Sequence, residues 1–374
     1  MSSSSSGIAA KLARKNILEL QPYRCARDDY SEGVLLDANE NAFGPTSLPT
    51  KNLDPYDNAN TLERYPDPYQ TPLKELVAKY RGHGLTPANL FVGVGSDEAI
   101  DLLMRIFCAP AQDNILITPP TYGMYKVCAK VNDVQIVSAP LTPDFDLDIP
   151  KTLDAVTDKT KLLFICSPGN PTCKAIPLKD VETIASSDKY DGIVVVDEAY
   201  VDFSAPDSSA VSLIQKYPNI VVLQTLSKAF GLAGIRCGFC IGAPDVIQLM
   251  NNVKAPYNVN ALTSEVAINA MQSIETLEKH VKETLEQRAV VKSRLEVLAD
   301  IVVKVYPSDS NFLLFRVKDK ALELYKTMAD KGVVTRFRGN ELHCDQCIRV
   351  TIGTPEENEK FLDLLQATWK ELNG

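Results

Sequence analysis

The chain has 374 residues, of which 45% are hydrophobic and 23% charged, so it can bury a large core and we expect two lobes. Its formal net charge is −9, and the sequence contains no run of basic residues. Both facts argue against nucleic acid as a partner. No apolar run approaches the length of a membrane helix. An anionic ligand would therefore have to be attracted by cations gathered locally.

The serine-rich start of the chain predicts a flexible segment over residues 1–15. No apolar core of a signal peptide follows it, and we expect a cytoplasmic protein. The nine cysteines form an odd set without the spacing of a small disulfide scaffold. That pattern favours free thiols in a reducing compartment.

From about Leu62 to Asn260 apolar strands alternate with amphipathic helices, which predicts an α/β fold with a mostly parallel sheet and helices on both faces. A long amphipathic helix from Thr276 to about Ala299 follows. The rest, from Asp300, reads as a smaller α+β domain. Expected strands lie at 90–94, 115–118, 134–139, 162–166, 193–196, 220–223, 238–242, 302–306, 312–317 and 348–352, and the clearest early helices at 72–80, 97–107 and 178–186.

The first motif with chemistry follows the strand at 90–94. Gly95, Ser96 and Asp97 form a glycine turn that opens a helix continuing to Phe107. Free backbone N–H groups and the positive end of the helix favour a phosphate at such a turn. Ser96 or Asp97 could instead simply cap the helix, and the two uses do not exclude each other.

Three later strands of the expected sheet end in polar residues. One runs into a turn held by proline and glycine that presents Asn170, the next ends at Asp197, and the third is followed by Lys228. Because parallel strands end at one edge of a sheet, Asp197 and Lys228 would lie near each other. A buried Asp–Lys pair or two solvent-exposed strand ends would explain them without chemistry. The alternative is a catalytic role, in which the buried amine of Lys228 reacts with an aldehyde to form a Schiff base.

These motifs together resemble those of fold-type-I aminotransferases, the class that uses pyridoxal phosphate. The family's order and spacing are met by Asn170-Pro171-Thr172, Asp197-Glu198-Ala199-Tyr200, Ser227-Lys228-Ala229-Phe230-Gly231 and a downstream Arg236. The resemblance extends from about Asn16 to the C-terminus. It implies the fold-type-I fold, pyridoxal 5′-phosphate as cofactor and a homodimer.

The resemblance also implies a role for each residue. Lys228 would form the Schiff base and carry the proton, Asp197 would keep the pyridine nitrogen protonated, and Tyr200 would hydrogen-bond the phenolic oxygen. For Tyr200, ordinary packing after a strand is the alternative. The other residues expected at the cofactor are Gly95, Ser96, Asp97, Tyr122 stacked on the ring, Asn170, Ser227, Arg236, the weaker candidate Thr225, and Tyr65 reaching across the dimer interface.

Two arginines late in the chain bear on the substrate. Arg336 and Arg349 each interrupt an apolar strand, where arginine usually binds a carboxylate or phosphate through two hydrogen bonds. Arg338 lies two residues after Arg336 and therefore on the same face of the strand. The alternative that these are edge-strand arginines facing water therefore stays open.

The N-terminal segments 16–23 and 35–41, with 310–314 and 349–354, resemble histidinol-phosphate aminotransferases. By that resemblance Tyr23, Asn39, Arg336 and Arg349 bind the substrate, and the arginines also take glutamate's carboxylates. The implied reaction exchanges an amino group between L-histidinol phosphate and 2-oxoglutarate, giving imidazole-acetol phosphate and L-glutamate in histidine biosynthesis.

Three other functions share this architecture and stay open: an aromatic or broad-specificity aminotransferase, a phosphothreonine decarboxylase, and a non-catalytic regulator that binds pyridoxal phosphate. The resemblance further implies a large cofactor-binding domain over 61–270. A small discontinuous domain would be built from 16–60 together with 271–374.

Cysteines raise two local questions. Cys173 stands where the family usually has glycine; if a positive φ were required there, cysteine would cost about 1 kcal/mol or more, so we expect a slightly different turn and retained activity. Cys237 and Cys240 lie three apart in a strand and would point to opposite faces, which excludes a shared metal without a turn. Cys344 and Cys347 lie in a more turn-like stretch, where a metal or redox role stays open although we expect no metal in the site.

Overall fold

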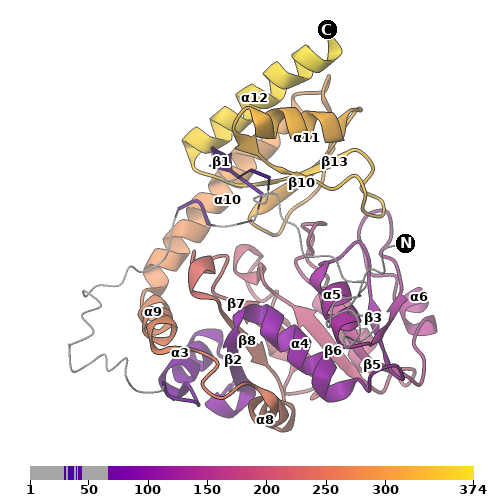
Figure 1. Ribbon diagram of the computed structural model, residues 1–374, viewed down its shortest axis with the longest axis vertical. Coiled ribbons are helices and arrows are strands. Elements are labelled where there is room, and N and C mark those ends of the chain that lie inside the picture. Colours follow the sequence, from indigo (N-terminus) through magenta and orange to yellow (C-terminus); the bar gives the residue numbers. More distant parts are fainter. Residues whose placement is uncertain (1–28, 31–32, 38, 40, 44–65) are drawn as a thin grey trace, which may run out of the picture.

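A computed structural model describes residues 29–30, 33–37, 39, 41–43 and 66–374 (Figure 1). A seven-stranded sheet with its helices forms the lower part of the molecule in this view, and a four-stranded sheet forms the upper part. The long helix α10 (Ile274–Glu296) runs between the two parts. Within the described ranges, no helix has both the length and the apolar character needed to cross a membrane.

The large sheet confirms the expected mostly parallel α/β arrangement. Only β8 runs antiparallel, and it does so to both of its neighbours, β2 and β7. All other neighbouring strands are parallel. The spatial order is β2 (Leu90–Val94), β8 (Cys237–Ile241), β7 (Ile220–Thr225), β6 (Ile193–Asp197), β5 (Thr160–Cys166), β3 (Asn114–Ile117) and β4 (Gln135–Ser138).

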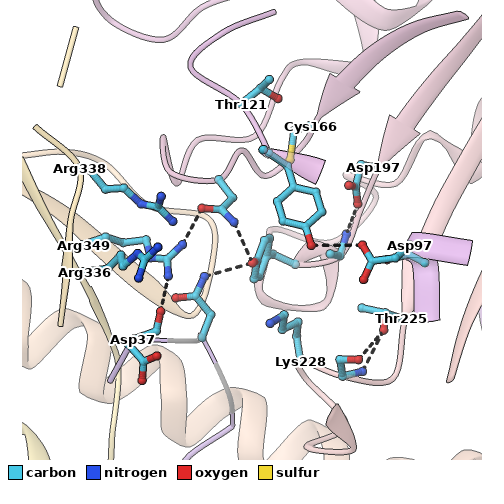
Figure 2. Close-up of a pocket in the computed structure, with 18 of the residues that line it drawn as sticks. Asp37, Asp97, Thr121, Cys166, Asp197, Thr225, Lys228, Arg336, Arg338 and Arg349 are labelled. Carbon is cyan, nitrogen blue, oxygen red and sulfur yellow. Dashed lines mark hydrogen bonds between the residues drawn. The ribbon is translucent and has the colours of Figure 1, made fainter. Parts of the chain in front are cut away.

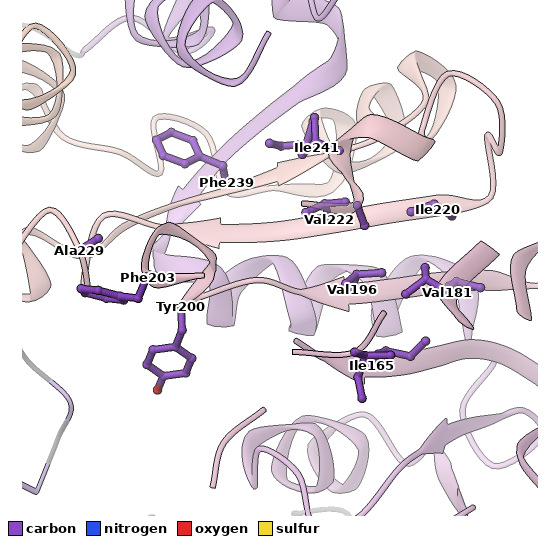
Figure 3. Close-up of a cluster of buried hydrophobic side chains, with 14 of the residues drawn as sticks. Ile165, Val181, Val196, Tyr200, Phe203, Ile220, Val222, Ala229, Phe239 and Ile241 are labelled. Atoms are coloured by element: carbon purple, nitrogen blue, oxygen red, sulfur yellow. The ribbon is translucent and has the colours of Figure 1, made fainter. Parts of the chain in front are cut away.

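Both faces of this sheet are buried, which is why its central strands read as continuous apolar runs rather than alternating ones. Val194 and Val196 pack into the core on one face, shown in Figure 3, and Val195 packs into the core on the other. Helices α3 (Thr71–Arg81), α6 (Ile149–Asp154), α7 (Leu178–Ala185), α9 (Ala261–Met271) and the start of α10 cover the first face, and α4 (Gly95–Phe107), α5 (Met124–Val131) and α8 (Pro244–Val253) cover the second.

The two cores show on which face of the sheet each of the two cysteines of β8 lies. Cys237 belongs to the core that contains Val222, and Cys240 belongs to the core on the opposite face. The expectation that these thiols point away from each other is therefore confirmed. Each acts as a small apolar side chain, and burial raises the pKa of Cys237 to about 12.

The upper part is built on an antiparallel sheet in the order β12 (Arg336–Phe337), β13 (Cys347–Thr351), β10 (Phe312–Val317) and β9 (Val302–Val305). A separate core packs this sheet against α10, α11 (Ala321–Asp330) and α12 (Pro355–Asn373). The helix α12 begins with a reciprocal capping box between Thr354 and Glu357.

One expected strand is divided in two. The apolar run around Arg336 forms β11 (Val333–Val334) and β12 on either side of the buried Thr335. The strand β11 pairs in parallel with β1 (Val34–Leu35), whereas β12 pairs with β13. This change of partner brings a segment from the start of the chain beside one from its end.

The expected strands and helices agree with those observed, and their ends differ by at most three residues. The helix α4 begins at Gly95 rather than at Asp97. Sequence analysis did not name α5, α6, α8, α9, α11 or α12, and it did not foresee the short 3₁₀ turns at Pro87–Asn89, Val201–Phe203, Ala210–Leu213 and Ala233–Ile235.

Candidate active site

A cavity of about 240 Å³ opens where the carboxyl ends of β5, β6 and β7 face the four-stranded sheet. It contains every described residue that the sequence analysis placed at a ligand, except Gly95, which lies directly behind it. Its lining is Asp37, Asn39, Ser96, Asp97, Thr121, Tyr122, Gly123, Cys166, Asn170, Asp197, Ala199, Tyr200, Thr225, Ser227, Lys228, Arg236, Arg336, Arg338, Glu341 and Arg349 (Figure 2). The two remaining candidates, Tyr23 and Tyr65, lie outside the described residues.

Asp197 is the last residue of β6 and is almost completely buried, with 2% of its surface exposed. Tyr125 donates a hydrogen bond from its hydroxyl to Asp197 Oδ2 at 2.7 Å, and the backbone N–H of Ala199 donates to Oδ1 at 3.3 Å. Burial raises the pKa of Asp197 to about 6, although both hydrogen bonds and the charge of Lys228 act in the opposite direction. A positive charge placed next to Asp197 would lower the pKa of this carboxyl group and keep it ionised.

Lys228 follows β7 and extends into the cavity from the side opposite the arginines (Figure 2). The lysine is partly buried and lines the cavity, so its amine is less enclosed than the buried amine considered from the sequence. Its Nζ lies 5.7 Å from the ring centre of Tyr200. An amine in this position can reach a ligand in the cavity and can exchange protons there.

The hydroxyl of Tyr200 is held by two amides that come from distant parts of the chain. Asn39 donates to it from Nδ2 at 3.1 Å, and Asn170 donates from Nδ2 at 3.5 Å. Burial raises the pKa of Tyr200 to about 12, so the hydroxyl keeps its own proton at neutral pH. Because both amides donate, that proton stays available for an acceptor in the cavity.

The start of α4 forms one corner of the cavity. Gly95 has a φ of +73°, and a Cβ at this position would lie 2.7 Å from Nη2 of Arg236. A Cβ at Gly238 of β8 would lie 2.4 Å from the backbone nitrogen of Ser96. Both glycines are therefore required for the close approach of α4, β8 and the guanidinium. No side chain caps α4, and the N–H of Gly95 donates to the backbone oxygen of Arg236 at 3.0 Å. The next two residues of the first turn, Ser96 and Asp97, line the cavity.

Side chains complete this corner of the cavity. Asp97 accepts a hydrogen bond from Tyr122 at 3.1 Å and another from Arg236 at 3.3 Å. Thr225 donates from Oγ1 to the Oγ of Ser227 at 2.9 Å, and it accepts the backbone N–H of Ser227 at 3.1 Å. The residues expected around the phosphate therefore lie together, and Thr225 holds Ser227 among them.

The arginines form the opposite wall. Arg349 is 3% exposed, donates from Nη1 to Asn170 Oδ1 at 2.6 Å, and donates from Nη2 to the backbone oxygen of Asp37 at 2.5 Å. Its guanidinium also lies 5.1 Å from the ring centre of Phe312. Arg336, on the edge strand β12, and Arg338 are partly exposed and line the same cavity. Three guanidinium groups thus gather at one wall of the cavity, although the chain as a whole carries a negative net charge.

Comparison with known proteins places this geometry in a family. Residues 31–365 match the family described as aminotransferase class I and II. The chain is 46% identical to the histidinol-phosphate aminotransferase of Candida maltosa, with 97% of this chain and 98% of that protein covered. The corresponding protein of Schizosaccharomyces pombe is 45% identical, with 96% and 97% covered.

The chain belongs to the class I and II aminotransferase family.

A solved structure shows the same fold. The histidinol-phosphate aminotransferase from Sinorhizobium meliloti, described in complex with pyridoxal-5′-phosphate, superposes with a TM-score of 0.85. It covers 96% of this chain and 98% of its own, at 22% sequence identity. At this identity the likeness establishes the fold-type-I aminotransferase fold, which agrees with the expectation from sequence.

Several residues of this aminotransferase cavity were missed by sequence analysis. Tyr125, Thr121, Cys166, Glu341 and, within the segment 35–41, Asp37 contribute to the cavity or to Asp197 although the sequence analysis gave none of them a role. The ring centres of Tyr125 and Tyr122 are 5.6 Å apart, but Tyr122 precedes α5, so helical spacing gave no signal for this neighbour of the site. The others become neighbours only through the packing of separate strands.

The aminotransferase differs from expectation at Cys173. The turn does not change to avoid a positive φ, because Cys173 adopts a φ of +67°. Its N–H donates to the oxygen of Gly169 at 2.8 Å, and its own oxygen accepts the N–H of Asp309 at 2.9 Å. The side chain is fully buried in the core. These contacts offset the strain of about 1–2 kcal/mol that a left-handed residue with a Cβ carries.

The remaining cysteine pair of the aminotransferase lies where the turn after β12 enters β13, whose first residue is Cys347. Cys344 and Cys347 are fully buried, and the N–H of Cys347 donates to the oxygen of Cys344 at 2.9 Å. Among the described residues, no group of three or more His, Cys, Asp or Glu side chains is arranged to hold a metal ion.

Proposed function

We propose that this protein exchanges an amino group between L-histidinol phosphate and 2-oxoglutarate, giving imidazole-acetol phosphate and L-glutamate, with pyridoxal 5′-phosphate as its cofactor. The observation that carries the proposal is one cavity in which Lys228 and Asp197 face three arginines. Histidinol-phosphate aminotransferases that match nearly the whole chain support the choice of substrate.

The residues present fit this cofactor. The uncapped start of α4, Ser227 and Arg236 suit a phosphate, and Gly95 leaves no room for a side chain beside them. The buried Asp197 suits a pyridine nitrogen, which it would keep protonated. When bound, the cofactor supplies an aldehyde that condenses with amines and a ring that accepts the electrons released from a Cα–H bond.

The residues of the chain would divide the remaining tasks. Lys228 would hold the cofactor. Once an incoming amine has displaced it, Nζ would take the proton from the substrate's Cα and deliver it to C4′, the carbon of the cofactor's aldehyde group. Asp197 would stay ionised and oriented, because Tyr125 and Ala199 bind its two oxygens. Tyr200 would donate its hydroxyl proton to the phenolic oxygen of the cofactor, with Asn170 beside it. Tyr122 would stack on the ring.

Substrate anions would bind at the wall of arginines. Arg336 and Arg349 lie opposite each other on neighbouring strands, so one oxyanion can bind both guanidinium groups. Phosphate and carboxylate both present oxygens that match this arrangement, which explains how one wall serves two substrates in turn. Asn39 contacts both Tyr200 and Thr351, and it would close the cavity from the N-terminal side.

Several parts of the proposal concern the whole assembly. We propose a cytoplasmic homodimer in which Tyr65 reaches the cofactor phosphate of the partner and Tyr23 contacts the substrate phosphate. We also propose a large domain over 61–270, a small domain of 16–60 with 271–374, and a flexible segment over 1–15. The separate core of the four-stranded sheet and the pairing of β1 with β11 support the discontinuous small domain.

A direct assay tests the function. The purified protein is incubated with L-histidinol phosphate and 2-oxoglutarate, and glutamate formation is measured beside assays with phenylalanine and aspartate as amine donors. We expect glutamate with histidinol phosphate above all and its loss in Lys228→Ala, whereas Lys254→Ala stays active. Release of carbon dioxide from phosphothreonine, a preference for phenylalanine, or full activity of Lys228→Ala would contradict the proposal.

A further inference from the structure

The wall of arginines contains an ion pair that the reaction described above does not use. Arg338 and Glu341 both line the cavity, and they come from the turn segment 338–346 between β12 and β13. Figure 2 shows Arg338 beside Arg349 and Arg336, on the side of the cavity facing Lys228. Nη1 of Arg338 lies 3.9 Å from Oε1 of Glu341, and the two side chains are 19% and 31% exposed.

The backbone holds this pair in place. The N–H of Arg338 donates to the oxygen of Cys347 at 2.8 Å, and the N–H of Glu341 donates to the oxygen of Arg338 at 2.9 Å. Arg316 of β10 donates from Nη2 to the oxygen of His343 at 3.1 Å. The segment is therefore braced against two strands, so that only the side chains of Arg338 and Glu341 need to move when a ligand enters.

The distance within the pair decides what could replace it. The 3.9 Å between Nη1 of Arg338 and Oε1 of Glu341 is longer than a hydrogen bond. A ligand oxygen about 2.8 Å from the guanidinium would therefore attract Arg338 more strongly than Glu341 does. A carboxylate carries one negative charge, as Glu341 does, and gains little by exchanging with it. A phosphate monoester carries up to two charges and three terminal oxygens, and it can draw Arg338 away from Glu341.

We propose that Arg338 is a third phosphate-binding arginine, which Glu341 holds until a phosphate ester enters the cavity. The inference rests on the proposed function and deepens it, because it names the residues that distinguish the two substrates. A phosphate ester engages Arg336, Arg349 and Arg338. A substrate carboxylate engages only the first two, because Arg338 stays with Glu341.

The test compares Arg338→Gln with wild-type holoenzyme. We expect the KM for L-histidinol phosphate to rise about tenfold or more, as expected for the loss of a charge-assisted hydrogen bond, while kcat changes little. The KM for glutamate and that for L-histidinol, which lacks the phosphate, should change less than about threefold. The matched control is Arg294→Gln, which removes an exposed Arg–Glu pair with an N–O distance of 2.8 Å on the far side of α10 and should change neither KM.

Glu341→Gln provides the second arm. With its competitor removed, Arg338 becomes available to carboxylates, so the KM for glutamate should fall several-fold. Adding Arg338→Gln to this variant should then raise the KM for glutamate, although the same change has little effect in the wild type. An Arg338→Gln effect on glutamate that is equal in both backgrounds would overturn the inference.

Binding of inorganic phosphate to the holoenzyme, followed by calorimetry, separates this inference from the proposed function. We expect Arg338→Gln to weaken phosphate binding about tenfold or more and Arg294→Gln to leave it unchanged. Equal phosphate affinity in Arg338→Gln and wild type would overturn the role of Arg338 even if histidinol phosphate is the substrate. Absence of turnover with histidinol phosphate would instead reject the proposed function, while weakened phosphate binding would still support Arg338.

Discussion

Arg336 and Arg349 face each other directly across the antiparallel pair of β12 and β13. Like charges in this register repel each other, because opposed side chains on one face start about 5 Å apart at Cβ. Residues that would destabilise an isolated sheet therefore place two guanidinium groups side by side at the cavity, where the proposed function needs an anion site. The two arginines differ in burial, since Arg349 is almost completely buried and Arg336 only partly.

This difference predicts separate effects of Arg336→Gln and Arg349→Gln. Arg336→Gln should raise the KM for both substrates and leave the thermal midpoint almost unchanged. Arg349→Gln should also destabilise the protein by about 1–3 kcal/mol, because Asn170 and the oxygen of Asp37 lose a buried donor. Steady-state kinetics and urea unfolding of both variants provide the measurement. Equal loss of stability in the two variants would refute this assignment.

Tyr125→Phe tests the support of Asp197. The hydroxyl of Tyr125 stabilises the ionised carboxylate, so its removal should raise the pKa of Asp197 further above about 6 and weaken cofactor binding. The loss of affinity for pyridoxal phosphate should be larger at pH 6.5 than at pH 8, measured by absorbance titration. Tyr190→Phe is the control, since that buried hydroxyl donates to the oxygen of Ile193 away from the cavity. A loss that does not depend on pH would contradict the electrostatic explanation.

Gly238→Ala tests the close packing behind the anion site. Its Cβ would lie 2.4 Å from the nitrogen of Ser96 and 2.5 Å from the carbonyl carbon of Gly95, so the start of α4 has to move. We expect affinity for pyridoxal phosphate to fall about tenfold or more, as for the loss of one or more hydrogen bonds to a charged group. Gly234→Ala, whose Cβ would meet no atom within 4 Å, should bind the cofactor normally. Unchanged affinity in Gly238→Ala would show that this packing is dispensable.

Glu198 predicts how stability depends on pH. Burial raises its pKa from 4.5 to about 7, against hydrogen bonds from Ser209, Gln224 and Ala210. Between pH 4.5 and 7 the native state therefore binds more protons than the unfolded state, so this contribution to stability is complete below pH 4.5 and is lost as pH rises through about 7. The loss is roughly 3 kcal/mol at most.

Urea unfolding of the cofactor-free protein from pH 5 to 8 measures this dependence. Glu198→Gln should flatten the decline in stability relative to wild type. Asp197, whose pKa is also raised, contributes a decline of the same sign in both proteins. An identical slope in wild type and Glu198→Gln would contradict the predicted proton uptake.

Cys173→Gly tests the left-handed turn. Glycine removes a strain of about 1–2 kcal/mol and also removes a buried side chain, so the free energy of unfolding should change by less than about 1 kcal/mol. Turnover should be retained. Cys173→Val, with a β-branched side chain at a φ of +67°, should be clearly destabilised. Thermal unfolding and the standard assay distinguish these outcomes, and a strongly destabilised Cys173→Gly would show that packing dominates.

Local patterns were sufficient for much of the fold and part of the site. Buried strands are short apolar runs, and the polar residue that ends such a run must lie at the sheet edge, so Asp197 and Lys228 could be placed together in advance. The glycine turn at Gly95 likewise predicted an anion site from its neighbours alone. Helices α11 and α12 were missed because their apolar faces are interpreted correctly only once the sheet they cover is known.

What the sequence by itself determined was therefore the set of reactive groups and the strands that carry them. Only the tertiary structure decided which residues from distant parts of the sequence contact those groups. Tyr125 reaches Asp197 across 72 positions, and Asn39 reaches Thr351 across 312. Arg338 joins Arg336 and Arg349 through the register of β12 and β13 and the turn that follows it. Such pairings depend on register and packing between separate elements, and no local periodicity encodes them.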